Sequence, residues 1–530
     1  MNSLLVFLPL LGMVLFKGGE GYYKPFFFGF FIAIAIFLIR KKEIQRNEFL
    51  LPLIFLSGAS FISALFSPAF LRSTGGFLET FSYLLFFLLL LLLKPEKKIL
   101  IYGLICLGII QVMFLPFQIH QRFSGSYRYA TYIIEPLFVG FFLSAYIKNK
   151  IAKFSLYSIF IVYIILSGSR VGILLFFLIP FLFKKWYLPL SVLLIASILI
   201  LAIPNPVGKR LKRKSDVFSF QRLKLWKQGI KTALERPYTG WGQRNYENAA
   251  KKNTFPVKEK NRIVYRYARI AHNQFIHYFA TMGIFGLFAF LFLFFIFFKG
   301  FSNYSIPLRL SVLVYFLHSF VDNPFYLPGN FLIFLMLLYI ISREKVTVQL
   351  KISKVTSLSF AIPIILYLLP IAGGVFDTLS IRASKNDNLS QSALFENIAY
   401  SLYPEAFRAK EIGLIYEKIF HKTNDLSNLF FSYRMTATSA KIDPLDYKNY
   451  LAVSNLIYRN MRYFTGMNKT IEENVLRAID LNPYDKTLLR DYIKFLHINR
   501  RFLEEVYMDQ YLKEIENGKK IPLPEAGEYR

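Results

Sequence analysis

Long apolar runs constrain what this 530-residue chain can fold into more than any other feature. A helix that crosses a bilayer needs roughly 20 mostly apolar residues, and fewer where neighbouring helices cover it. Runs of this kind predict an all-α, polytopic membrane protein with about 12–13 transmembrane helices. They lie near residues 3–16, 25–39, 48–66, 77–93, 99–116, 130–147, 151–167, 171–183, 187–203, 273–298, 307–321, 328–342 and 356–374.

Lys and Arg in the short connections predict the side of the membrane that each connection faces, because basic residues near span ends are retained in the cytoplasm. Every second short connection is basic, from Arg40-Lys41-Lys42 onward. We expect a multi-pass protein of a bacterial inner membrane with a cytoplasmic N-terminus. Residues 1–376 then form the transmembrane domain. Two long segments lie in the periplasm: the loop 204–271 and the tail 377–530.

The net charge of +31 is concentrated in the outer loop and the cytoplasmic connections. The loop 204–271 carries 18 Lys and Arg against 4 Asp and Glu, whereas the tail 377–530 carries 22 against 21. A basic surface usually binds nucleic acid, anionic lipid or a phosphate-rich ligand. For a basic loop on the periplasmic side of a membrane, a phosphate-bearing lipid is a better candidate partner than nucleic acid. We expect no nucleic acid partner.

The tail has the pattern of amphipathic helices across residues 390–515. Three similar junctions recur about 40 residues apart, as helical-hairpin repeats require: Ser401-Leu-Tyr-Pro404, Lys441-Ile-Asp-Pro444 and Asp480-Leu-Asn-Pro483. We expect each proline to begin the next helix at its first turn. The tail resembles a tetratricopeptide (TPR) domain, which binds or positions a protein partner; an ordinary helical domain with chance turns is the alternative.

Polar side chains near the outer ends of the spans are candidates for function, because such groups are costly inside a membrane. Arg170 follows a tight turn, Ser167-Gly168-Ser169. It is either a snorkelling interfacial arginine or an anion site, since its planar guanidinium fits phosphate. Arg222 and Trp226 begin an amphipathic stretch that we expect to end before Pro237. A generic basic helix on the membrane surface is the alternative there.

One histidine stands where the basic loop enters the next span. A lone histidine at a helix start, such as His272, is more often structural. Dense positive charge nearby, however, disfavours the imidazolium. The ring would then be neutral at pH 7 and able to act as a general base.

Two further polar sites lie at outer span ends. His318 and Asp322 are four residues apart on one face, so they either pair with each other or position an acceptor. Glu135 is a buried carboxylate that could orient Arg170 or another basic group. The sequence contains no Gly-x-x-x-x-Gly-Lys loop for nucleotide and no Cys/His or Asp-x-Asp cluster for a divalent metal. We therefore expect no cofactor and no metal.

Taken together, these motifs resemble the O-antigen ligase and O-antigen polymerase superfamily over residues 115–345. The usual Asn-Pro-rich segment is replaced by Ser126-Tyr-Arg-Tyr-Ala130. The matching pieces are, in order, Arg122-x-x-Gly125, Ser169-Arg170, Arg222-x-x-x-Trp226, Pro237-x-x-Gly240-x-Gly242, His272-Asn273, Gly283-x-x-Gly286 and His318-x-x-x-Asp322.

The resemblance implies a metal-independent, inverting glycosyltransferase that moves a glycan from undecaprenyl pyrophosphate on the periplasmic face. It implies that His272 is the general base for the acceptor hydroxyl. Arg170 and Arg222 would then bind the pyrophosphate and stabilise the charge that develops on it. Supporting roles fall to Glu135, Arg122, Arg269, His318, Asp322 and Trp226.

Four functions are compared. The first is ligation of O-antigen to lipid A–core, and the second is polymerisation of repeat units on the lipid carrier. A lipid-linked glycan transporter would carry charge through the midplane and show internal repeats of its spans; we see neither in the sequence. A structural, receptor-like protein leaves the histidine and arginine motifs unexplained. Ligation is our principal prediction.

Overall fold

The computed structural model describes residues 2–15, 24–39, 43–44, 47–114, 124–127, 131–167, 169–176, 178, 221–259, 262–342, 350–351 and 361–519. Most of these residues are helical, and the predicted all-α membrane fold is confirmed. Three of the described helices are long and apolar enough to cross a membrane: α4 (Phe70–Leu93), α14 with the turn that follows it (Gln274–Asn303) and α18 (Ala361–Lys385).

Helices occupy the predicted apolar runs wherever those runs are described. The run 187–203 lies outside the described residues. α4 begins at Phe70, earlier than the run 77–93 suggests. The other membrane helices are α1 (Asn2–Leu15), α2 (Lys24–Leu38), α3 (Leu50–Leu65), α5 (Lys97–Val112), α6 (Ile134–Leu143), α7 (Lys150–Leu166), α8 (Arg170–Leu175), α15 (Ile306–Ser319) and α16 (Pro328–Ile341).

α16 lies in the centre of the membrane helices, because every residue from Pro328 to Ile341 is buried. It contacts α1, α4, α5, α6 and α15. α14 lies at the periphery instead: Phe290 and Phe297 are buried, whereas Phe288 and Phe295 are exposed. Exposed phenylalanines on an apolar helix can pack against the acyl chains of lipids. We therefore expect this face of α14 to contact the membrane.

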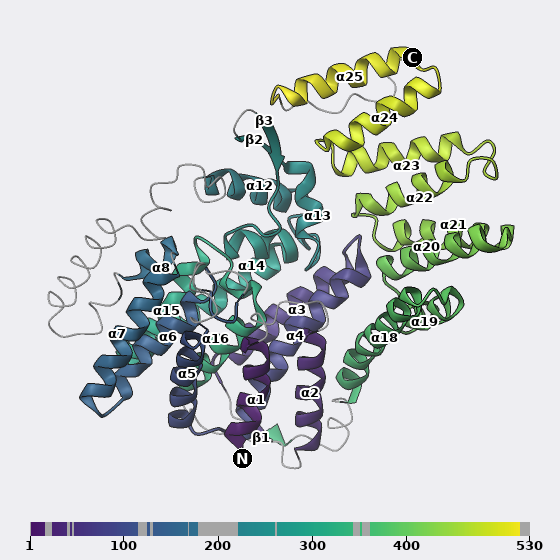
Figure 1. Ribbon diagram of the computed structural model, residues 1–530. Helices are drawn as coiled ribbons and strands as arrows, with labels where there is room; N and C mark the ends of the chain where they lie inside the picture. The colour runs from purple at the N-terminus through teal and green to yellow at the C-terminus, as the bar shows by residue number, and fades with distance from the viewer. Residues whose placement is uncertain are drawn as a thin grey trace.

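The strands form two short antiparallel pairs. β1 (Glu43–Ile44) pairs with β4 (Leu350–Lys351). The two strands belong to connections that are both predicted, from their Lys and Arg residues, to face the cytoplasm. β2 (Phe255–Glu259) pairs with β3 (Arg262–Arg266) in the outer loop. This loop also contains α12 (Arg222–Leu234) and α13 (Tyr246–Ala250). In Figure 1 it lies at the end of the membrane helices opposite the N-terminus.

The tail is a column of helical hairpins that rises beside the outer loop (Figure 1). α18 is continuous through residue 376 and packs on α19, and three further hairpins pair α20 with α21, α22 with α23, and α24 with α25. The tail helices are α19 (Leu389–Leu402), α20 (Ala406–Thr423), α21 (Leu426–Ile442), α22 (Tyr447–Arg459), α23 (Asn468–Leu481), α24 (Lys486–Ile498) and α25 (Phe502–Glu516).

The recurring prolines separate successive hairpins, but they do not start the helices as we expected. Pro444 and Pro483 each lie three residues before the next helix begins. The residue just before the helix is an aspartate whose carboxylate accepts from backbone N–H groups: Asp446 from Lys448, and Asp485 from residues 487 and 488. These N-caps satisfy donors that a helix start leaves unpaired.

The tail packs against the outer loop and the outer end of α4. The ring of Tyr265 in β3 stacks on Tyr484, with centroids 4.6 Å apart. Lys486 Nζ donates to the carbonyl oxygen of Ile263 at 3.0 Å. Arg72 Nη2 lies 2.7 Å from an oxygen of Asp443. The tail therefore contacts both the hairpin β2–β3 and the outer end of α4.

Candidate functional site

α12 carries the first two polar groups of the site. Leu225, Gly229 and Ala233 recur at helical spacing and are buried, and α12 packs on α14. Leu223 is exposed. The helix ends at Leu234, as Pro237 predicts. This packing places the start of α12, with Arg222 and Trp226, near the start of α14.

The turn after α12 interlocks with a break in α14. Gly283 has a φ of +66°, and a Cβ at this position would collide with the carbonyl oxygen of Tyr238. The break leaves the Thr281 carbonyl free to accept from the N–H of Gly242 at 2.9 Å. Gly240 also approaches this backbone, because its own Cβ would meet Thr281. The spaced glycines therefore allow two backbones to touch.

Hydrogen bonds made by Trp226 and Asn273 fix the backbone of His272. Its φ is +51°, in the left-handed region, directly before α14. Asn273 caps α14 by accepting from the N–H of Ile276 at 3.0 Å, and its amide donates to the carbonyl oxygen of Phe320 at 2.8 Å. Trp226 Nε1 donates to the carbonyl oxygen of His272 at 2.9 Å. A strained residue fixed this firmly is typical of a functional position.

Asp322 joins His272 to Arg222. One carboxylate oxygen lies 2.9 Å from His272 Nδ1, and the other accepts from Arg222 Nη2 at 3.1 Å. The backbone N–H of Asn323 also donates to Asp322 at 3.0 Å. Burial of Asp322 opposes its ionised form. The hydrogen bond from His272 and the charge of Arg222 outweigh burial and hold the pKa of Asp322 well below its usual range.

A cavity of about 480 Å³ opens beside this group, and we call it the His272 cavity. His272 and Asp322 line one part of it, and Arg266 and Arg269 bring positive charge to the wall. Tyr132, Tyr267 and Tyr326 add aromatic surface. A concave site with aromatic walls and a few convergent charged groups can orient a polar ligand.

A second, fully buried network lies behind Asp322 in the membrane helices. Glu135 accepts a hydrogen bond from His318 Nδ1 with one oxygen and from Asn330 Nδ2 with the other, the latter at 3.1 Å. Tyr127 donates to Asn330 at 2.8 Å. We expected Glu135 to orient a basic group such as Arg170, and His318 to pair with Asp322 or position an acceptor. In the structure His318 pairs with Glu135 across helices instead.

The remaining predicted residues are distributed around these groups. Arg170 begins α8, which contacts α7 and α15, and its part in anion binding stays a prediction. Arg269 lines the His272 cavity and lies 3.7 Å from a carboxylate oxygen of Glu247. Arg122 lies outside the described residues.

Sequence reasoning missed several residues that the structure brings to this region. Asn330 sits in the apolar run 328–342, and a buried amide in a membrane helix is a signal that could have been used. Arg266 and Tyr326 line the His272 cavity. Nothing in their local sequence distinguishes them from other loop residues, so only the fold identifies them.

Comparison with known families supports the same region. Residues 155–291 match the family model described as O-antigen ligase. The matched segment runs from α7 into α14 and contains Arg170, Arg222 and His272, whereas Glu135 and Asp322 lie outside it. No curated protein matches the chain.

Proposed function

The chain carries a domain of the O-antigen ligase superfamily, and on that premise we propose that it is an O-antigen ligase-like glycosyltransferase. It transfers a glycan from undecaprenyl pyrophosphate to a hydroxyl of lipid A–core, on the periplasmic face of a bacterial inner membrane. One observation carries the proposal: the hydrogen-bonded series of His272, Asp322 and Arg222 at the edge of the His272 cavity.

Asp322 keeps the proton of His272 on Nδ1. An ionised carboxylate accepts hydrogen bonds and donates none, so Nδ1 is the donor in the 2.9 Å contact. In the neutral ring Nε2 then keeps its lone pair, as a general base requires. The same carboxylate stabilises the imidazolium that forms once Nε2 has taken a proton, as in a hydrolase triad.

The reaction is a single displacement at the anomeric carbon. The acceptor hydroxyl gives its proton to Nε2 of His272 as its oxygen attacks that carbon. The new glycosidic C–O bond forms while the bond from the anomeric carbon to the pyrophosphate oxygen breaks. The electron pair of the broken bond leaves with the pyrophosphate. Attack from the face opposite the leaving group inverts the anomeric centre.

Cations at the His272 cavity offset the charge that grows on the leaving pyrophosphate. Arg222 Nη2 binds Asp322, whereas Arg222 Nη1 is buried without a hydrogen-bond partner among the described residues. That donor is available to a phosphate oxygen. Arg266 and Arg269 add positive charge to the wall, and we assign Arg170 to the same task.

Polymerisation of repeat units on the carrier would use the same groups, so a deletion strain is the first test. A lipopolysaccharide gel is run beside an assay of carrier-linked glycan. We expect core without O-units and long glycan accumulating on the carrier, which is the outcome of lost ligation. Core capped by a single O-unit would assign polymerisation instead. An unchanged pattern in both assays would contradict both assignments.

The base role of His272 has its own test in purified protein. We expect His272→Ala to reduce transfer by about 10²–10⁴-fold, because a positioned general base contributes that much. His497→Ala is the matched control, since His497 is exposed in the tail. Transfer by folded His272→Ala at the rate of the control would refute the mechanism.

A further inference from the structure

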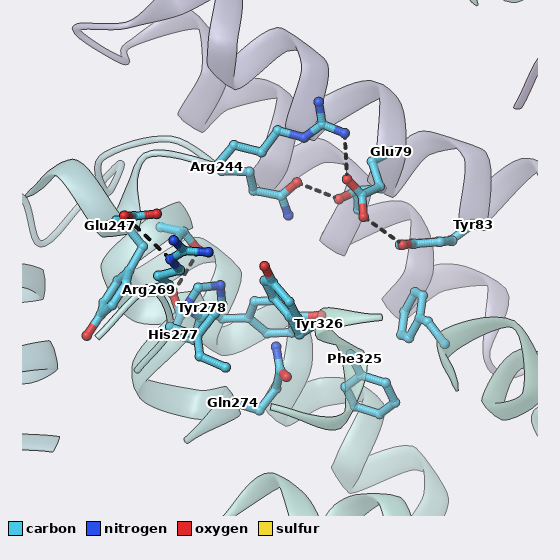
Figure 2. A pocket seen from close by; sticks show the side chains of 16 residues that line it. Glu79, Tyr83, Arg244, Glu247, Arg269, Gln274, His277, Tyr278, Phe325 and Tyr326 are labelled. Atoms are coloured by element: carbon cyan, nitrogen blue, oxygen red, sulfur yellow. Dashed lines mark hydrogen bonds and ion pairs between the residues drawn. The ribbon is translucent and has the colours of Figure 1, made fainter. Parts of the chain in front are cut away.

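A second cavity shares a wall with the His272 cavity, and we call it the side cavity. Its volume is about 240 Å³, and Figure 2 shows the residues that line it. Arg269, Ile270 and Tyr326 line both cavities. The remaining walls come from α4, α13, the turn before α13, the first turns of α14, the turn Pro324–Tyr326 and α16. A ligand in the side cavity would therefore lie close to His272.

The charged groups of the side cavity are paired with one another. Arg244 Nη2 lies 2.8 Å from an oxygen of Glu79, and Arg269 Nε lies 3.7 Å from an oxygen of Glu247. Glu79 also accepts from the hydroxyl of Tyr83 at 3.0 Å. Two arginines thus face two carboxylates, as Figure 2 shows. The side cavity has no excess positive charge for a phosphate, unlike the His272 cavity.

Two neutral polar atoms of the side cavity lack a protein partner. Gln274 Oε1 and His277 Nδ1 are buried and have no hydrogen-bond partner among the described residues. Both residues line the side cavity, and Gln274 is 1% exposed. The hydroxyl of Tyr246 also lacks a partner there, but it lies against Gly229 of α12 and not in the side cavity. Buried polar atoms are costly when unpaired, so those in a cavity wall indicate a hydrogen-bonding occupant.

Aromatic rings complete the walls. Tyr278, Phe325, Tyr326 and Phe331 line the side cavity together with the polar atoms. Figure 2 shows the Gln274 amide among Tyr278, Tyr326 and Phe325. A sugar ring matches this combination, because its C–H faces pack on aromatic rings while its hydroxyls donate and accept hydrogen bonds.

We propose that the side cavity binds one uncharged sugar ring of a glycan substrate, held by Gln274 and His277 next to the reacting centre. The assignment rests on the proposed function, which supplies glycans on both sides of the reaction. The ring belongs either to the acceptor or to the donor glycan, and its chemistry is the same in both. The charged pyrophosphate lies in the His272 cavity, on the other side of the shared wall.

Two variants remove polar atoms from the side cavity. His277→Phe deletes the ring nitrogens, and Gln274→Met replaces the amide by an apolar chain of similar length. If these atoms had no ligand, their removal would be neutral or stabilising, because each is an unpaired buried group. If they bind a sugar, we expect each variant to raise KM for one substrate roughly tenfold, with kcat within about twofold.

Tyr315→Phe is the matched control. Tyr315 is buried and its hydroxyl also lacks a partner among the described residues, but it does not line the side cavity. A rise in KM for the acceptor alone would assign the ring to the acceptor. A rise for the carrier-linked donor alone would assign it to the donor. Unchanged KM values, or the same rise in Tyr315→Phe, would overturn the proposal.

A binding measurement separates failure of the side cavity from failure of the proposed function. Full-length protein in micelles is probed by saturation-transfer NMR. The probes are the oligosaccharide released by mild acid from the carrier and the core oligosaccharide released from lipid A. We expect a signal from one probe that Gln274→Met abolishes and Tyr315→Phe keeps. Such binding without any transfer would refute only the proposed function. Transfer without any effect of Gln274→Met would refute only the proposed sugar site in the side cavity.

Discussion

At the scale of single residues, Asp322 connects the polar groups of the candidate site. It is buried, it lies 2.9 Å from His272 Nδ1 and 3.1 Å from Arg222 Nη2, and it accepts a backbone N–H. Removing one member of a buried charged group leaves the others without compensation. The carboxylate therefore sets both the proton position on His272 and the direction of Arg222.

The first prediction concerns the proton on His272. In Asp322→Asn an amide replaces the carboxylate, and its NH₂ can donate to Nδ1, which would favour the opposite tautomer. We expect the rate of glycan transfer to fall by up to about 10⁴-fold, which is the loss for the equivalent change in a hydrolase triad. The measurement is kcat in purified protein, with Asp387→Asn in the exposed part of the tail as control. Equal rates in the two variants would remove Asp322 from the mechanism.

The pH dependence of stability follows from the lowered pKa of Asp322. A carboxyl group with a lower pKa in the folded state than the unfolded value of about 3.9 stabilises the fold fully above that value. The stabilisation is lost as the pH falls through the folded-state pKa. We expect the Tm difference between the wild-type protein and Asp322→Asn to shrink as the pH falls below about 4. A difference that grows on acidification would contradict this sign.

Among elements, the join between the α12–α13 turn and α14 determines where the site lies. The N–H of Ile284 donates to the carbonyl oxygen of Pro237 at 2.8 Å, next to the bond between Gly242 and Thr281. Asn245 Nδ2 adds hydrogen bonds to Ser67 and Ser73 on the α3–α4 side. The turn is therefore bonded to two membrane elements, which holds α12 and the His272 segment in position.

The next prediction tests this join. Gly283→Ala would place a Cβ against Tyr238 at a φ of +66°, so both sterics and backbone strain oppose it. We expect Tm and the yield of folded protein to fall clearly. Gly58→Ala is the control, because a Cβ on Gly58 in α3 meets nothing within 4 Å. Alanine has a higher helix propensity than glycine, so we expect the control variant to be neutral or slightly stabilising. A Gly283→Ala protein as stable as the control would refute the interlock.

At the scale of the whole molecule, the tail is coupled to the membrane helices. α18 crosses the predicted boundary at residue 376 as one helix, and its Asp377 forms two 2.9 Å contacts with the buried Arg408. Tyr265 and Tyr267 line both the His272 cavity and a larger cavity of about 1000 Å³ between the hairpin β2–β3 and the tail. Movement of the tail would therefore change the shape of the site.

The last prediction concerns this coupling. Tyr484→Ala removes the ring that stacks on Tyr265, so the hairpin β2–β3 loses its aromatic contact with the tail. We expect faster amide hydrogen exchange in the hairpin and in α24, and a lower transfer rate. Tyr458→Ala, at an exposed tail position, is the control. Unchanged exchange in the hairpin would show that the tail does not support it.

The helices of this protein, and the apolar side of each one, can be predicted from local sequence. Runs of apolar residues and helical periodicity are local properties, so the described membrane helices and the tail helices follow from them. The position of His272 at a helix start and the end of α12 before Pro237 were also readable, because Asn273 and Pro237 are local signals.

Which polar groups meet depends on how distant segments of the chain pack together. The four-residue spacing of His318 and Asp322 predicted that they share a face, but α15 ends at Ser319 and the chain turns Asp322 toward His272. His318 then pairs with Glu135, 183 residues away in sequence. Spacing reports the faces of one helix, whereas a hydrogen bond depends on where distant segments bring their side chains. The side cavity exists for the same reason, since α4, α13 and α14 form it only when packed together.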